Sequence, residues 1–281
     1  MQESTIGIIG AAGKMGFWLS EALQKAGTKL FCYDPVLNNG VTLPGLVQNS
    51  DIILVTTPLS VTPSVLEEVS KYVSPDQLVG DISSVKAPVA SALQGLPCEK
   101  VSLHPLFGPR ALTLSGRSIV WSQVSLTGQR SSYLRSLLTS QGALLIDLNL
   151  DEHDQMMSVV QVTTHLHLLL FGRITADFSP SSIENTLLCA TPPFTALAAF
   201  TSRMLSQDAE LYADIAGTNP HTRDILVKLK DFINLLIEND TPANIKQAFL
   251  ELYQPLKPFW SDSVIKAGTN KSDQIDELLR D

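Results

Sequence analysis

The chain has 281 residues, of which 44% are hydrophobic and 17% are charged, and its formal net charge is −8 at pH 7. This length suggests about two domains, and the hydrophobic fraction is that of a globular chain with a sizeable core. The acidic balance, without a cluster of lysine and arginine, argues against a nucleic-acid or anionic-membrane partner. A small anionic substrate is still compatible with it, because local charge in a cleft can oppose the net charge.

The cysteine content and the N-terminus bear on the compartment. Cys32, Cys98 and Cys189 cannot form a disulfide framework, and their spacing matches no zinc or CxxC motif. The chain reaches an apolar segment by about Thr5 without a basic region or a cleavage site, and no apolar run attains the ~18 residues of a membrane-spanning helix. We therefore expect a reduced, cytoplasmic protein.

The first half of the chain alternates between short strand-like runs and helical patterns. Strands rich in Ile, Val and Leu that alternate with helices indicate a parallel sheet covered on both faces, and right-handed crossovers then give a doubly wound α/β fold. The predicted strands are Thr5–Gly10, Lys29–Tyr33, Asp51–Thr57, Gln77–Ile82, Lys100–His104, Ser118–Val124 and Ala143–Leu148. The predicted helices between the early strands are Lys14–Ala26, Val61–Tyr72 and Ala87–Leu93.

The first strand runs directly into the sequence Gly10-Ala-Ala-Gly13-Lys-Met-Gly16 and then into a helix. This is GxxGxxG, one residue longer than GxGxxG, and it meets the same physical needs: a tight turn, close approach of backbone to a pyrophosphate, and unpaired N–H groups at a helix N-terminus. Such a motif alone is also compatible with an ordinary loop. Its position at the start of a βαβ unit favours a dinucleotide site, so we assign residues 1–150 to an NAD-binding Rossmann domain.

The second strand ends in Asp34, about twenty residues after the glycine motif, where a carboxylate accepts hydrogen bonds from ribose hydroxyls. A 2′-phosphate there would meet a like charge at a cost of roughly 4 kcal/mol for an effective dielectric of about 20, so NAD is favoured over NADP. The alternative is that Asp34 is a turn residue before Pro35. The residues expected to bind the cofactor are Gly10, Ala12, Gly13, Lys14, Met15, Gly16, Asp34, Thr57 and Pro58.

After about Asp151 the pattern becomes helical, and we predict an all-helical domain over residues 151–281. Thr241 followed by proline is typical of a helix N-cap with proline at the first helical position. Apolar stripes here are typical of a core or a dimer seam. One such stripe comprises Ile225, Leu229, Phe232 and Leu236.

Residues that follow the later strands are the candidates for chemistry, because ligands of doubly wound sheets lie outside the carboxyl ends of the strands. Ser84 follows the fourth predicted strand and His104 ends the fifth. Imidazole titrates near neutrality, so His104 suits a general acid or base. The alternative is that His104 only caps its strand through a backbone hydrogen bond.

Four segments together resemble the prephenate dehydrogenases, in particular the dehydrogenase portion of the bifunctional chorismate mutase–prephenate dehydrogenases. They are Ser83–Lys86, Leu103–Pro109, Glu152–Gln155 and Gln207–Ile215. The resemblance covers nearly the whole chain. It implies a Rossmann domain followed by a helical dimerisation domain, hence a homodimer. It also implies the conversion of prephenate and NAD to 4-hydroxyphenylpyruvate, carbon dioxide and NADH in tyrosine biosynthesis, without a catalytic metal.

The same resemblance implies roles for four residues. His104 would contact the C4 hydroxyl of the substrate, and Ser84 would contact and orient the same hydroxyl. His165 would lie near the substrate pocket, and Arg223 would bind a substrate carboxylate. The alternatives are that Arg223 pairs with a neighbouring aspartate on a helix surface, and that His165 is a satisfied core histidine.

Two further histidine-containing patterns have simpler interpretations. We interpret Glu152-His153-Asp154 as an N-terminal helix cap with charges that suit the helix dipole. A zinc site from His153, His165 and His167 lacks the i, i+4 geometry and is disfavoured.

Three rival functions stay open or are disfavoured. Arogenate or an amino-substituted prephenate differs from prephenate by one side-chain group, and the sequence does not separate them. A β-hydroxyacid dehydrogenase would need a lysine on Met156–Arg173, which has none. A non-catalytic NAD-binding sensor would not need Ser84, His104 and Arg223 together. Because the chain starts almost at the first strand, we do not expect a chorismate mutase domain.

Overall fold

The computed structural model describes residues 4–238 and 241–278 and divides into two compact units. The first unit is Met1–Met157 with Asp214–Pro220, and the second is Ser158–Ala213 with His221–Asp281. Residues 151–157 pack within the first unit, since His153 and Asp154 are buried there. The separate roles predicted for residues 1–150 and 151–281 stay a prediction.

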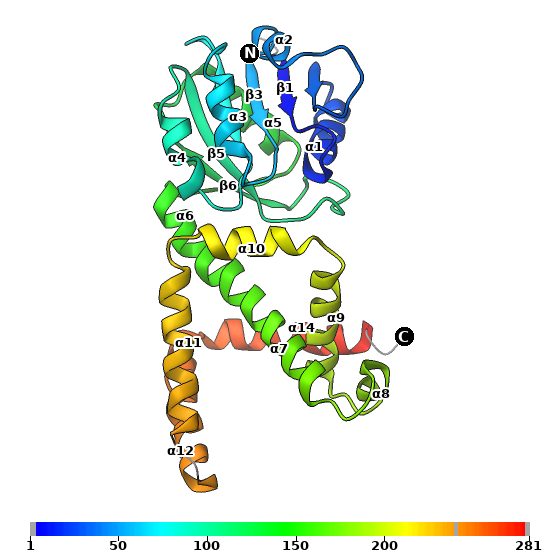
Figure 1. Ribbon diagram of the computed structural model, residues 1–281, viewed down its shortest axis with the longest axis vertical. Helices are drawn as coiled ribbons and strands as arrows, with labels where there is room; N and C mark the ends of the chain where they lie inside the picture. The colour runs from blue at the N-terminus through cyan, green and yellow to red at the C-terminus, as the bar shows by residue number, and fades with distance from the viewer. Residues whose placement is uncertain (1–3, 239–240, 279–281) are drawn as a thin grey trace. The chain divides into compact units, whose positions relative to one another are not determined.

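The first unit is built on a seven-stranded sheet of order β2-β1-β3-β4-β5-β6-β7 (Figure 1). Each predicted strand is confirmed, with ends shifted by a few residues. The strands are β1 Ile6–Ile9, β2 Leu30–Tyr33, β3 Ile52–Val55, β4 Leu78–Asp81, β5 Glu99–Pro105, β6 Ser118–Gln123 and β7 Leu144–Asp147. The doubly wound α/β class is therefore confirmed for this unit.

The sheet is mixed rather than wholly parallel. Strands β1 to β5 are parallel, β6 is antiparallel to β5, and β7 is parallel to β6. A parallel return needs a long crossover that is usually helical. Residues 106–117 form a short connection without a helix, so the chain comes back in the opposite direction.

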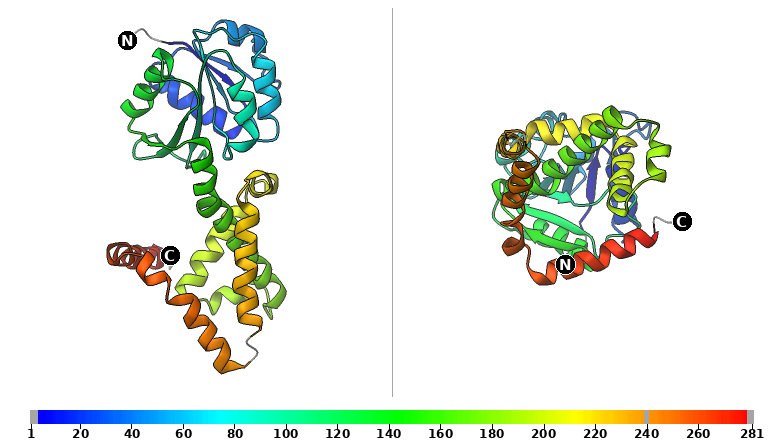
Figure 2. Two further views of the ribbon diagram at one scale, coloured as in Figure 1. Left: turned by 90° about the vertical axis from the view of Figure 1, so that its left-hand side faces the viewer. Right: turned by 90° about the horizontal axis from the view of Figure 1, so that it is seen from below.

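Helices cover both faces of this sheet, with α1 and α5 on one face and α2, α3 and α4 on the other (Figure 2). The helices of the unit are α1 Lys14–Lys25, α2 Leu43–Gln48, α3 Thr62–Val69, α4 Ala87–Gln94, α5 Gln129–Ser140 and α6 Leu150–Met157. The predicted helices correspond to α1, α3 and α4. The sequence interpretation assigned no helix to the segments of α2 and α5.

The core lies between the sheet and its helices. Every residue of β1 and β3 is buried, as expected of central parallel strands covered on both faces. Leu19 and Leu23 of α1 and Trp121 of β6 join the same apolar cluster. This packing fixes the carboxyl ends of β1 to β5 along one edge, where the candidate site residues lie.

The second unit is helical in its described residues, as predicted. It contains a π-helical turn Ser158–Thr163 and the helices α7 Thr164–Phe178, α8 Ile183–Leu188, α9 Pro192–Leu205, α11 Thr222–Ile237, α12 Pro242–Tyr253, α13 Leu256–Phe259 and α14 Asp262–Leu278, while α10 Ala209–Thr218 is shared between the units. The predicted cap is confirmed, because the Thr241 hydroxyl accepts from the Asn244 N–H at 3.3 Å. Among residues 4–238 and 241–278, no helix has both the length and the apolar character needed to cross a membrane.

Candidate active site

The glycine motif forms the tight turn between β1 and α1. Gly10 has a φ of +88°, a left-handed conformation that favours glycine, and its N–H donates to the Tyr33 carbonyl at 2.9 Å. Gly16 is buried against the turn, since a Cβ there would overlap the Gly10 carbonyl oxygen. Gly13 is the N-cap of α1 and has no side chain to satisfy the first-turn N–H groups. This geometry fits an anionic group such as a pyrophosphate.

Asp34 lies directly beside this turn, immediately after β2. One carboxylate oxygen accepts from the Ala12 N–H at 3.2 Å, and the other accepts from the Val36 N–H at 3.2 Å. The carboxylate therefore both shapes its own turn and contacts the glycine motif, so the two interpretations of Asp34 are compatible. Ala12, Gly13 and Lys14 are exposed, and Met15 is half-buried.

The neighbouring strand β3 brings a threonine pair to the same edge. The Thr56 hydroxyl donates to the carbonyls of Ile9 (2.9 Å) and Gly10 (3.1 Å), which ties the end of β3 to the glycine turn. Thr57 is hydrogen-bonded to Thr62 through the two hydroxyls at 2.9 Å, and Pro58 follows. The structure thus brings the predicted cofactor residues Thr57 and Pro58 to the strand next to β1.

The chemical candidates of the first unit lie at the ends of β4 and β5. Asp81 is the last residue of β4, and half-buried Ser84 follows three positions later. His104 lies near the carboxyl end of β5 and is 3% exposed. Because β4 and β5 are adjacent and parallel, the turn that holds Ser84 and the imidazole of His104 belong to one edge of the sheet.

A buried polar network surrounds His104. Its Nδ1 lies 2.8 Å from Nε2 of His153, and Nδ1 of His153 lies 2.8 Å from Oδ1 of Asp154. The Asp154 carboxylate also accepts from the backbone N–H groups of Lys86 (2.7 Å) and Ala87 (2.8 Å) at the start of α4. His153 is 0% exposed. Three segments far apart in sequence therefore meet at one point.

Lys86 supplies the cation of this network. Its Nζ donates to the carbonyls of Ser83 (2.8 Å) and Leu103 (2.6 Å), and the side chain is completely buried. Burial lowers the pKa of Lys86 to about 8, although the negative charges of Asp81 and Asp154 act in the opposite direction. The lysine is thus held between the turn after β4 and strand β5.

Both imidazoles of the network are neutral at pH 7. Burial holds the pKa of His104 well below its usual 6.5, and the charge of Lys86 and the proximity of His153 lower it further. Burial also lowers the pKa of His153, with Lys86 acting in the same direction, while the hydrogen bond that His153 donates to Asp154 raises it. A neutral imidazole carries one lone pair that can accept a proton, so this site contains a group suited to general-base chemistry.

Sequence reasoning missed Lys86, His153 and Asp154 as members of this network. The interpretation of Glu152-His153-Asp154 as a helix cap is correct for Glu152, which exchanges hydrogen bonds of 2.9 Å with Asn149 in a capping box. It is wrong for His153 and Asp154, whose side chains point into the first unit. The available signal was the adjacent His-Asp pair, whose partners lie far away along the chain.

His165 and Arg223 belong to the second unit. The half-buried ring of His165 packs edge-to-face on Tyr212 with ring centroids 4.6 Å apart, and burial lowers its pKa. His167 is exposed, and its Nδ1 donates to the Thr163 carbonyl at 2.7 Å. Arg223 is exposed in the first turn of α11. The substrate-binding roles of His165 and Arg223 stay predictions.

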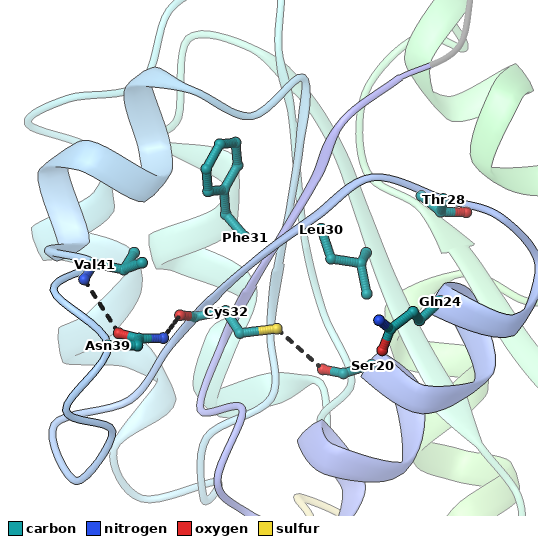
Figure 3. A pocket seen from close by; sticks show the side chains of 8 residues that line it. All are labelled: Ser20, Gln24, Thr28, Leu30, Phe31, Cys32, Asn39 and Val41. Atoms are coloured by element: carbon teal, nitrogen blue, oxygen red, sulfur yellow. Dashed lines mark hydrogen bonds between the residues drawn. The ribbon is translucent and has the colours of Figure 1, made fainter.

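A separate hollow lies at the outer edge of the sheet beside α1 and β2 (Figure 3). It encloses about 330 Å³, and its wall includes Ser20, which accepts from the Cys32 thiol at 3.6 Å. Asn39 closes one side and donates to the Cys32 carbonyl at 2.9 Å. None of the predicted catalytic, substrate or cofactor residues lines this hollow, so it is distinct from the site described above.

The mostly parallel sheet, the glycine turn and Asp34 define a Rossmann-type nucleotide-binding unit with a buried histidine at the end of β5. Residues 37–142 match the family model described as prephenate dehydrogenase, nucleotide-binding domain. Together with the relatives described next, this match supports the prephenate dehydrogenase family for this chain.

Two curated relatives span most of the chain. The T-protein of Haemophilus influenzae is 25% identical over 91% of this chain and 67% of its own length. A protein of Methanocaldococcus jannaschii named "Probable arogenate/prephenate dehydrogenase" is 23% identical over 98% of this chain and 67% of its own length. The crystal structure of prephenate dehydrogenase from A. aeolicus, in complex with hydroxyphenyl propionate and NAD+, covers 99% of both chains with a TM-score of 0.69 and 16% identity. This last likeness supports the fold.

Proposed function

We propose that the protein is an NAD-dependent prephenate dehydrogenase, which oxidatively decarboxylates prephenate to 4-hydroxyphenylpyruvate. The likeness to the family supports a dehydrogenase, and the choice of prephenate is the part that we add. The observation that carries the proposal is the neutral, buried imidazole of His104 at the carboxyl edge of a sheet that also holds the glycine turn. A base and a dinucleotide cradle on one edge are what hydride transfer from an alcohol carbon requires.

NAD fits the residues of the turn. The N–H groups of the first turn of α1 and the exposed Ala12 and Gly13 would hold its pyrophosphate, and Asp34 would accept from its ribose hydroxyls. Thr57 and Pro58 would border it from the end of β3. When bound, NAD supplies the acceptor for the hydride that leaves the substrate.

His104 is the proposed proton acceptor. As the alcohol carbon loses hydride, its hydroxyl becomes a carbonyl, and the hydroxyl proton needs a base within hydrogen-bond reach. A positioned base of this kind contributes about 10²–10⁴-fold to the rate. Ser84 would hydrogen-bond the same hydroxyl and orient it. Loss of the ring carboxylate as carbon dioxide makes the ring aromatic, so the proposed reaction calls for no metal.

Arg223 and His165 are the other two residues for which we propose substrate contacts. Arg223 would bind a substrate carboxylate through its planar guanidinium, which matches a carboxylate with two parallel hydrogen bonds. His165 would border the substrate pocket, with its ring held in place by Tyr212.

Arogenate or an amino-substituted prephenate is the second candidate substrate. The name of the M. jannaschii relative includes arogenate, which supports testing it. A non-catalytic NAD sensor is the candidate from another class. A sensor would need only the nucleotide turn, whereas this chain also keeps a hydrogen-bonded base at the end of β5.

The test is the appearance of NADH absorbance at 340 nm with NAD and prephenate, arogenate or 4-amino-4-deoxyprephenate in parallel. We expect turnover with prephenate, and His104→Asn should lower kcat by about 10²-fold or more while NAD still binds. NADH from arogenate alone would reassign the substrate. Absence of NADH from all three, with NAD binding intact by fluorescence titration, would favour the sensor.

We also propose that the second unit associates with a second copy of the chain. Helices α7 and α11 contain no buried residue in the single chain, and α11 and α12 contact one another while keeping large apolar side chains exposed. These include Leu226, Val227, Phe232, Ile233, Ile237, Ile245, Phe249, Leu250 and Tyr253. So much exposed apolar surface is typical of an obligate interface. Light scattering should give twice the 30.5 kDa mass of one chain, and a monomer would refute this part.

A cytoplasmic location completes the proposal. Cys32, Cys98 and Cys189 are all free thiols in the structure, which suits a reducing compartment. Cell fractionation should recover the NADH-forming activity with cytosolic markers, and recovery with a secreted fraction would contradict this location.

A further inference from the structure

We propose that His153 and Asp154 act as positioning residues for His104: they hold its proton on Nδ1 and thereby make Nε2 the proton-accepting nitrogen. The catalytic consequence rests on the proposed dehydrogenase function, whereas the position of the proton can be measured without any substrate.

The Asp154 carboxylate sets the direction of the chain of hydrogen bonds. It already accepts from two backbone N–H groups, those of Lys86 at 2.7 Å and Ala87 at 2.8 Å. An ionised carboxylate has acceptors and no donor. Nδ1 of His153, which lies 2.8 Å from Oδ1 of Asp154, must therefore carry the hydrogen of that bond.

The position of the hydrogen on His153 determines the position of the hydrogen on His104. Because His153 is neutral and carries its hydrogen on Nδ1, its Nε2 holds a lone pair and can only accept. Nδ1 of His104 lies 2.8 Å from that lone pair, so it must be the donor. Neutral His104 then has its own lone pair on Nε2. Any other tautomer of His104 would set two lone pairs, or two hydrogens, against each other in a buried site.

The hydrogen-bonded series Asp154–His153–His104, called the relay below, is held rigidly by its surroundings. His153 and Asp154 are 0% and 1% exposed, and the backbone carbonyl of Asp154 accepts from the Asn219 side chain at 2.8 Å. The two backbone donors to the carboxylate belong to the start of α4. A fixed tautomer requires such fixed partners, because an imidazole that can rotate presents either nitrogen.

The relay also affects the charge that develops during the reaction. The hydroxyl O–H bond of the substrate breaks and its proton forms a bond to Nε2 of His104, while the C–H electron pair leaves as hydride to NAD and the C=O bond forms. The charge of Lys86 disfavours the resulting imidazolium, whereas the carboxylates of Asp154 and Asp81 favour the charged form of the neighbouring His153. His153 connects the imidazolium to the carboxylate of Asp154 through two hydrogen bonds, so Asp154 offsets part of the repulsion from Lys86.

A simpler structural role must be distinguished from this one, because Asp154 also satisfies N–H groups of α4. The decisive readout is the tautomer of His104, measured by two-bond ¹H–¹⁵N correlation on ¹⁵N-histidine-labelled full-length protein near pH 7.5 without substrate. Signals missing in His104→Asn identify His104. We expect the pattern of a protonated Nδ1 and an unprotonated Nε2. A protonated Nε2 in the unaltered protein would overturn the proposal, even if every His153 variant failed to fold.

Variants at His153 extend the test to function. His153→Phe keeps a ring and removes both nitrogens, so His104 should lose its single tautomer and kcat should fall about 10²-fold, with KM for NAD nearly unchanged. His153→Gln keeps one acceptor and one donor and should restore much of both the tautomer and kcat. The matched control is His167→Phe, an exposed histidine outside the network, for which both should stay unchanged. An unaltered tautomer and kcat in His153→Phe would refute the relay.

The proposed function can fail separately. If the unaltered protein forms no NADH with any of the three substrates, the dehydrogenase assignment is wrong, and the tautomer of His104 still decides whether the relay exists. If the protein is active and the tautomer is the opposite one, only the relay is wrong.

Discussion

Replacing Gly16 by alanine tests how the glycine turn supports the nucleotide site. A Cβ at this position would lie 2.5 Å from the Thr56 hydroxyl oxygen and 2.9 Å from the Gly10 carbonyl carbon, and closer still to the Gly10 carbonyl oxygen. Real Cβ atoms essentially never approach other heavy atoms within 3.0 Å. Two of these contacts are with backbone, so α1 must move away from the turn.

The expected cost is that of overpacking a close contact, about 1–3 kcal/mol in the free energy of unfolding. For a domain of this size, each kcal/mol corresponds to about 2–4 °C in Tm. The same displacement moves the first-turn N–H groups of α1 relative to the turn. We therefore expect Kd for NAD to rise about tenfold, which corresponds to about 1.4 kcal/mol.

The matched control is Gly95→Ala at the end of α4. A Cβ there would lie 3.6 Å from the Ser91 carbonyl oxygen, an ordinary contact, and Gly95 has an αR conformation that alanine also adopts. This change should leave NAD binding intact and stabilise the protein by up to ~1 kcal/mol. Thermal unfolding and fluorescence titration with NAD measure both effects. Equal behaviour of the two variants would show that the close approach at Gly16 is unimportant.

Four further outcomes are expected for the site. Asp34→Ala should reduce the preference for NAD over NADP by about tenfold or more, because the repulsion of a 2′-phosphate is lost; an unchanged ratio of kcat/KM for the two cofactors would remove this role. Arg223→Ala should raise KM for prephenate and have a smaller effect on kcat. The loss of binding free energy should be about 2 kcal/mol or more for a desolvated carboxylate contact. Steady-state kinetics that leave KM unchanged would place the carboxylate elsewhere. Because the pKa of His104 lies well below 6.5, its base form persists as pH falls through 6.5, and kcat/KM should decline only at lower pH. Lys86→Met removes a charge that lowers this pKa, so the acid limb of the pH profile should move upward, and a downward movement would contradict the electrostatic argument.

Protonation of His104 and His153 links the stability of the folded protein to pH, and acidification should lower it. His104 and His153 have lowered pKa values in the folded protein, so the unfolded chain binds more protons once the pH falls below about 6.5. Their contribution to stability is therefore present above pH 6.5 and is lost on acidification.

Local sequence patterns were sufficient for most of the first unit. Short apolar runs separated by helical segments predicted all seven strands, because strand formation there depends on residues that are neighbours in the chain. The glycine turn and Asp34 were predictable for the same reason: one βαβ unit brings them together. The direction of β6 could not be predicted, because an apolar run has the same pattern in either direction. Helix α5 was missed because its serines and threonine weaken the helical signal.

The sequence by itself determined the glycine turn, the acidic residue after β2 and the histidine at the end of β5. Only the tertiary structure showed that His104 contacts His153, 49 positions away, and that Lys86 contacts Asp154, 68 positions away. Periodicity and motif spacing report which residues are neighbours along a strand or a helix. The charge state and tautomer of an imidazole depend instead on burial and on partners brought together by folding, so they were decided by the packing of β4, β5, α4 and α6.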